Sequence, residues 1–172
     1  MTNPALRDWI ERFLTHLRLE RRLSPHTAAS YGRDLGSLAD YCAAHGLADW
    51  AALDQQHLRS FAARLHAGGL SPRSVQRHLS ATRSLFRFLQ REGAATRNPG
   101  TAVQAPKVKK RLPQALDADQ MARLLEFRVS DTLGARDKAI MELLYSSGLR
   151  LAELVSLDLE ALDLTEASLR VT

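Results

Sequence analysis

The chain has 172 residues, of which 24 are Lys or Arg and 19 are Asp or Glu, so its formal net charge is +5. This length suits one domain or two small ones, and a hydrophobic content of 45% argues against a disordered chain. No apolar run approaches the roughly 18 residues of a membrane helix, and the single cysteine, Cys42, excludes an internal disulfide and a cysteine-rich zinc site.

Four amphipathic helices are predicted in residues 1–92. The first carries apolar residues at helical spacing between Leu6 and Leu17, mixed with charges rather than gathered into a signal-peptide core. The second begins at Ser24-Pro25, because serine is a favoured N-cap and proline suits the first helical position. The third follows Asp54, and Ser71-Pro72 begins the fourth. We therefore expect residues 1–92 to form an all-α domain. From the composition, we expect a cytoplasmic protein.

Helical periodicity stops in residues 93–114. Three prolines and the turn Asn98-Pro99-Gly100 prevent a continuous helix, and the segment ends in basic residues. We expect an extended basic linker here. Helical patterns return in residues 115–172, and Ser168–Thr172 alternates like a first strand with no partner in the chain. This part is predicted to be the incomplete beginning of a second domain.

The basic residues are concentrated toward the N-terminus. Residues 1–106 carry a net charge of +6, residues 107–111 add +4, and residues 112–172 carry −5. Twenty of the 24 basic residues are arginine, whose planar fork binds phosphate through two hydrogen bonds. A general preference of the genome for arginine would also explain this composition. The charge asymmetry nevertheless favours a polyanion, and nucleic acid over a membrane surface, as the partner.

The fourth predicted helix carries a strip of arginines. On a helical wheel Arg73, Arg77, Arg83, Arg87 and Arg91 fall within an arc of roughly 120°, opposite the apolar stripe. Arginine pairs with phosphates and guanine edges, so this face suits contact with DNA. A solvated charged face is the alternative, although such faces usually mix both signs of charge.

The second helix begins with hydroxyl and basic residues opposite its apolar stripe. They could hydrogen-bond phosphate near the helix N-terminus, or they could serve as caps only. The residues predicted to contact DNA are His26, Thr27, Ser30, Arg33, Arg73, Gln76, Arg77, Ser80, Arg83, Ser84 and Arg87, with Lys107, Lys109, Lys110 and Arg111 in the linker.

One corner of the second part could carry chemistry. Gly148 ends a predicted helix and Arg150 begins the next, which places a guanidinium where it could grip a phosphate and stabilise its charge. By pattern alone, a local salt bridge from Arg150 to Glu153 is the simpler interpretation. Tyr145 lies on a strongly apolar helix and is expected to pack in a core. Neither a metal site nor a glycine-rich phosphate loop is indicated by the sequence.

Over essentially its whole length the sequence resembles the XerC/XerD group of tyrosine recombinases, and XerC more closely. The similarity includes Leu23-Ser24-Pro25 with Thr27 and Tyr31, and is strongest from Arg136-Asp137-Lys138-Ala139 to Gly148-Leu149-Arg150-Leu151-Ala152-Glu153-Leu154. It implies a mainly α fold, with a four-helix SAM-like core-binding domain followed by the helical start of a truncated mixed α/β catalytic domain. Arg150 matches the first catalytic arginine of the family and Glu153 a supporting acidic position. The family cleaves DNA with a tyrosine nucleophile and no cofactor or metal.

The resemblance implies site-specific recombination that resolves chromosome dimers at a target with two half-sites. The implied partners are double-stranded DNA and a XerD-like recombinase, which assemble in a tetrameric synapse at the nucleoid. A septal DNA translocase is a further implied partner. Neither a membrane nor a small-molecule substrate is implied. None of the six histidines begins the family's His-x-x-Arg motif, and no tyrosine here matches the nucleophile. We therefore expect an N-terminal fragment that binds DNA without cutting it. The alternatives are a non-catalytic sequence-specific DNA-binding module or decoy, and a helical protein-interaction scaffold.

Overall fold

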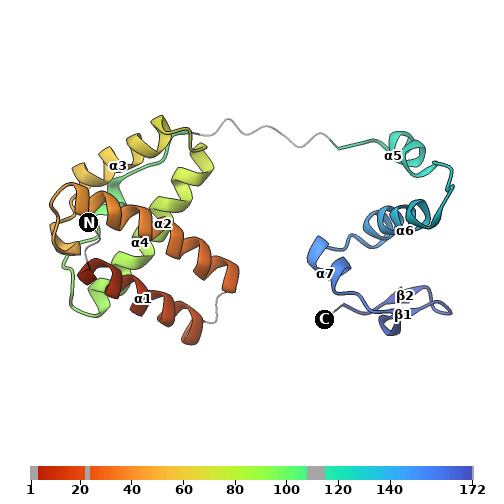
Figure 1. Ribbon diagram of the computed structural model, residues 1–172, viewed down its shortest axis with the longest axis horizontal. Helices are drawn as coiled ribbons and strands as arrows, with labels where there is room; N and C mark the ends of the chain where they lie inside the picture. The colour runs from red at the N-terminus through yellow and green to blue at the C-terminus, as the bar shows by residue number, and fades with distance from the viewer. Residues whose placement is uncertain (1–3, 22–23, 108–114, 172) are drawn as a thin grey trace. The chain divides into compact units, whose positions relative to one another are not determined.

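The computed structural model describes residues 4–21, 24–107 and 115–171 (Figure 1). Contacts between residues divide the chain into two units, Met1–Lys110 and Arg111–Thr172. The described part of the first unit is entirely helical apart from its loops, and that of the second combines short helices with a small β-hairpin.

The first unit is built from four α-helices, and short caps set where they begin. The side chains of Ser24, Asp54 and Ser71 each accept a hydrogen bond from a first-turn backbone amide, as their positions in the sequence predict. Helix α1 packs along α2, and α4 packs against the other three helices. The elements are α1 (Pro4–Leu19), α2 (Pro25–Ala44), the 3₁₀ helix η1 (Trp50–Ala52), α3 (Gln55–Ala67) and α4 (Pro72–Arg91).

The hydrophobic core of this unit lies where the four helices meet. Its fully buried side chains include Leu6, Phe13, Leu35, Leu38, Leu58, Val75, Leu79, Leu85 and Leu89. Each such side chain stabilises the fold by about 1.5–3 kcal/mol relative to exposure. Cys42 belongs to the same core, and burial raises the pKa of its thiol to about 12. The predicted apolar stripes of the first, second and fourth helices therefore contribute to this core.

The structure differs from the predicted linker between residues 93 and 105. Ala95 and Val103 are buried in the core of the first unit, and the 3₁₀ helix η2 (Pro99–Ala102) packs against α3 and α4. The side-chain amide of Asn98 donates to the backbone carbonyl of Arg83 over 3.0 Å. Proline excludes a long helix here but does not prevent tertiary packing, so the helical unit continues past residue 92.

The second unit begins with a reciprocal cap. The Asp117 carboxylate accepts from the backbone amide of Gln120 at 2.8 Å, and the Gln120 side chain accepts from the backbone amide of Asp117 at 3.1 Å. The elements that follow are α5 (Ala118–Leu125), α6 (Thr132–Ser147), α7 (Leu151–Val155), the 3₁₀ helix η3 (Leu159–Ala161), β1 (Leu162–Asp163) and β2 (Ser168–Leu169).

The strand expected to lack a partner is paired. Leu162 of β1 lies opposite Leu169 of β2 in an antiparallel hairpin. The carboxylate of Asp163 closes the turn by accepting from the backbone amides of Thr165 and Glu166, both at 3.0 Å. The alternating pattern at Ser168–Thr172 marked β2 correctly, but its partner β1, which is equally short at two residues, was not predicted.

The second unit buries little apolar surface. Among its described residues only Leu149 is buried. Tyr145, which the sequence placed in a core, is 57% exposed, because no second apolar layer among the described residues covers this face of α6. The other exposed large apolar side chains of the unit are Leu116, Leu124, Val129, Leu133, Leu151, Val155, Leu159, Leu164 and Val171.

Candidate nucleic-acid interface

Helix α4 presents the arginine strip, but its members have different surroundings. Arg73 and Arg87 are exposed, and neither takes part in an ion pair or side-chain hydrogen bond found among the described residues. Gln76 is exposed and Ser80 is half-buried. Arg91 instead lies among acidic groups, 3.2 Å from Glu92. Two unpaired cations on one helical face form a surface suited to phosphate groups.

Arg77 is held by a buried carboxylate. Its Nε donates to Asp34 Oδ2 over 2.8 Å, and its Nη2 donates to Asp34 Oδ1 over 2.9 Å. Asp34 lies on α2 and is only 3% exposed, whereas the Arg77 side chain is 48% exposed. This two-bond pair fixes the plane of the guanidinium at the surface where α2 and α4 meet.

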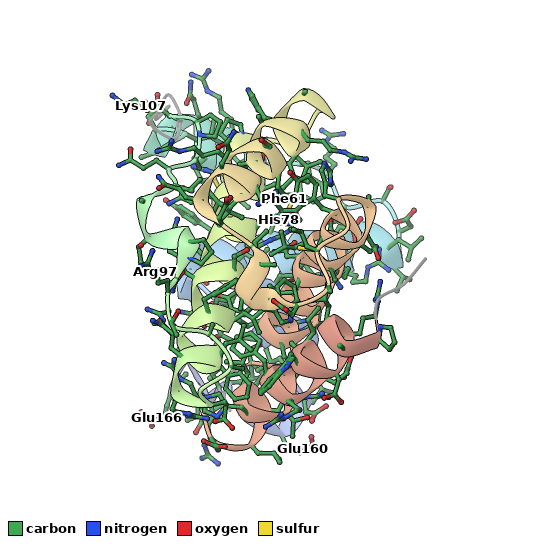
Figure 2. All side chains as sticks on the ribbon, turned by 90° about the vertical axis from the view of Figure 1, so that its left-hand side faces the viewer. Phe61, His78, Arg97, Lys107, Glu160 and Glu166 are labelled. Carbon is green, nitrogen blue, oxygen red and sulfur yellow. The ribbon has the colours of Figure 1, made fainter. Side chains whose placement is uncertain are left out.

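His78 lies behind this ion pair. Its Nε2 is 3.3 Å from Asp34 Oδ1, and its ring and that of Phe61, which lie side by side in Figure 2, pack edge to face. The His78 Nδ1 is buried and, among the described groups, has no hydrogen-bond partner. Burial lowers the pKa of His78 despite the opposing attraction of the Asp34 carboxylate, so the ring favours the neutral form. This cluster leaves no signal in the sequence, because Asp34 and His78 each look like an ordinary polar position in an amphipathic helix.

Arg83 and Ser84 have structural surroundings. Arg83 is half-buried, and its Nε donates to the backbone carbonyl of Gly100 over 3.0 Å. A Cβ atom at Gly100 would lie 2.6 Å from Arg83 Cγ, so glycine allows the loop to approach α4 this closely. Ser84 is 9% exposed. Both residues lie on the predicted face, but they are largely occupied in packing.

The start of α2 presents the remaining predicted contacts. His26 and Arg33 are exposed, whereas Thr27 and Ser30 are half-buried. Arg33 Nη2 donates to Ser30 Oγ over 3.2 Å, and Arg33 lines an open groove with Arg7 and Arg64. Of the basic residues predicted in the linker, Lys107 is exposed. Lys109, Lys110 and Arg111 lie outside the described residues.

The corner after α6 has the predicted geometry. Gly148 ends the helix in the left-handed conformation, with φ of 64°, which favours glycine. Arg150 precedes α7, where Glu153 Oε2 accepts from its backbone amide at 2.7 Å and Glu153 Oε1 accepts from its Nη1 at 2.8 Å. These two hydrogen bonds, the backbone one first, lower the pKa of Glu153. The Arg150 side chain is 85% exposed and therefore accessible to a ligand while Glu153 orients it.

Other site types find no support in the described part of the chain. It contains no group of three or more His, Cys, Asp or Glu side chains placed to hold a metal ion. None of its helices is long and apolar enough to cross a membrane.

Comparisons with known proteins find matches to both parts of the chain. The family model "Phage integrase, N-terminal SAM-like domain" matches residues 10–93, and the model "Phage integrase family" matches residues 114–172. Tyrosine recombinase XerC of Pseudomonas putida KT2440 is 50% identical over 163 residues, which are 94% of this chain and 54% of that protein. XerC of Pseudomonas aeruginosa PAO1 is 50% identical over 167 residues, 96% of this chain and 55% of that protein. The chain thus spans about half the length of these curated relatives.

Solved structures share the fold. The XerH site-specific recombinase bound to its difH substrate matches with a TM-score of 0.68 at 16% identity, over 95% of this chain and 60% of that one. The Tn1549 transposon integrase in complex with circular intermediate DNA matches with a TM-score of 0.68 at 17% identity, over 95% of this chain and 53% of that one. The predicted fold class, a SAM-like helical domain followed by the start of a catalytic domain, is confirmed.

Proposed function

The chain belongs to the phage integrase family of tyrosine recombinases, and we propose that it acts in site-specific DNA recombination, supplying DNA binding and one catalytic arginine. The observation that carries the proposal is the face of α4 on which Arg73 and Arg87 are exposed and unpaired among the described residues. Duplex DNA is a dense linear array of phosphate charges, so such a face gains affinity by releasing condensed counterions.

We propose a catalytic role for Arg150. Cleavage of a phosphodiester builds negative charge on the phosphate oxygens, and a fixed guanidinium stabilises that charge in the transition state. Glu153 acts as the positioning residue, because it bonds both the backbone amide and Nη1 of Arg150. The remaining N–H groups of this exposed guanidinium are then available to the phosphate.

The proposed substrate is double-stranded DNA with two half-sites around a short spacer. By analogy with the relatives, we propose a XerD-like recombinase as the partner in a tetrameric synapse, and a septal DNA translocase as a regulator. The site of action would be the nucleoid in the cytoplasm.

The basic residues of the linker are proposed to follow the DNA backbone; they are Lys107, Lys109, Lys110 and Arg111. Replacing all four with serine should therefore weaken specific and non-specific binding by similar factors.

Salt titration tests the DNA-binding proposal. Each lost phosphate contact should reduce the magnitude of the slope of log K against log salt concentration by about 0.9. We expect Arg73→Ala and Arg87→Ala each to show this reduction with duplex DNA. Arg59→Ala, which removes an exposed arginine of α3 outside the predicted face, is the matched control and should leave the slope unchanged. Equal slopes for all four proteins would contradict the assignment of this face.

We further propose that the 172-residue chain binds its half-site without cleaving it. Cleavage needs a nucleophile in line with the phosphate and several groups that stabilise charge. A nicked suicide substrate traps any covalent protein–DNA product as a slower band on a denaturing gel, and we expect no such band. A band that disappears in Tyr145→Phe, which changes an exposed tyrosine, would overturn this proposal.

A further inference from the structure

The Asp34–Arg77 pair leaves one edge of a fixed guanidinium available. A guanidinium has five N–H groups, and Asp34 occupies Nε and one N–H of Nη2. The edge formed by Nη1 and Nη2 keeps two parallel donors. Nearly half of the Arg77 side chain is exposed, and its Nη1 has no hydrogen-bond partner among the described groups. Arg77 therefore presents a bidentate hydrogen-bond donor whose orientation is fixed by Asp34.

Charge separates Arg77 from its neighbours on α4. The Asp34 carboxylate offsets the charge of Arg77, so the pair gains less from a phosphate than Arg73 or Arg87 would. Two hydrogen bonds to neutral acceptor atoms depend more on the direction of the donors than on net charge. Arg77 can still donate such bonds while it is bound to Asp34. In the major groove, guanine offers that acceptor pair through O6 and N7. The carboxylate also restricts the arginine rotamers before DNA binds, which lowers the entropy lost on binding.

We propose that Arg77 is a specificity-determining residue that reads one guanine edge in the target half-site, with Asp34 as its positioning residue. Arg73 and Arg87 contact phosphates and set affinity without regard to sequence. This inference rests on the proposed DNA-binding function, and it assigns different tasks to arginines of one helical face.

Selection from a random-sequence duplex library tests the assignment. The 172-residue chain is used as wild type and as Arg77→Lys. This variant keeps a cation beside Asp34 but removes the planar guanidinium and its two parallel N–H donors. Arg87→Lys is the matched control, because it makes the same change on the same helix without a carboxylate partner. We expect Arg77→Lys to lose the preference for G·C at one base pair, by roughly 5- to 150-fold in relative affinity. Arg87→Lys should select the wild-type motif.

A third variant separates positioning from a purely structural role. Asp34→Asn removes the charge that offsets Arg77, so the magnitude of the salt slope for duplex binding should rise by about 0.9 while the guanine preference weakens. A merely structural role would lower the urea midpoint without changing the slope or the motif, and that result would overturn the inference. An unchanged motif for Arg77→Lys would overturn it as well. If the wild-type chain selects no sequence, sequence-specific binding itself fails and the inference fails with it.

Discussion

Replacing Arg77 with alanine should destabilise the first unit far more than a surface substitution does. Asp34 is 3% exposed, and two of its hydrogen bonds come from Arg77. Without the guanidinium, the Asp34 carboxylate keeps one ion-pair neighbour among the described side chains. This neighbour is His78, whose Nε2 lies 3.3 Å away. Breaking a buried ion pair from one side costs about 3–5 kcal/mol. Because the Arg77 side chain is 48% exposed, water reaches part of the vacated space, and we expect about 2–3 kcal/mol.

Tryptophan fluorescence in urea measures this cost. The two tryptophans, Trp9 and Trp50, both lie in the first unit, so their emission follows the unfolding of that unit. With an m-value of about 1.5 kcal/mol per molar urea, a loss of about 2–3 kcal/mol lowers the midpoint by about 1.3–2 M. Arg87→Ala removes an unpaired arginine from the same helix and should change stability by less than about 0.5 kcal/mol.

A double variant isolates the effect of the charge. Adding Asp34→Asn to Arg77→Ala replaces the stranded carboxylate with an uncharged amide, which costs less to bury without a cation. The double variant should therefore recover part of the lost stability. If Arg77→Ala lowered the midpoint no more than Arg87→Ala, the Asp34–Arg77 pair would not stabilise the unit and this reasoning would be wrong.

Three further predictions concern the first unit. Gly100→Ala should lower the free energy of unfolding by about 1–3 kcal/mol, because its Cβ would overlap Arg83; an unchanged urea midpoint would show that the loop shifts instead. The pKa of His78 is lowered from 6.5 in the folded state, so between the two pKa values the unfolded state binds more protons. The free energy of unfolding therefore falls on acidification, by at most about 1.4 kcal/mol per pH unit, until the pH passes the folded-state pKa. His78→Gln should flatten this fall between pH 7 and 5, and parallel stability profiles would count against a buried neutral imidazole. Cys42, fully buried with a thiol pKa of about 12, should react with a thiol reagent only when the unit opens; labelling at the rate of a free thiol would contradict its place in the core.

The sequence alone determined the helices of the first unit, because the signals that specify them are local. Apolar spacing placed the buried faces, and Ser24, Asp54 and Ser71 cap the helices they were expected to begin. The corner at Arg150 was likewise predictable, since Gly148 ends a helix and Glu153 lies one turn further on. Periodicity and capping act within a few residues, so they leave a direct pattern in the chain.

Tertiary structure decided what each polar group on those helices does. A helical wheel treats Arg77 and Arg87 alike, but among the described residues Asp34, 43 residues before Arg77, accepts hydrogen bonds from Arg77 and none from Arg87. The prolines after residue 92 indicated an extended segment, whereas burial of Val103 and the hydrogen bond from Arg83 to Gly100 attach it to the helices. Such pairings depend on surfaces that meet only when distant segments pack together, and no short window of sequence contains both partners.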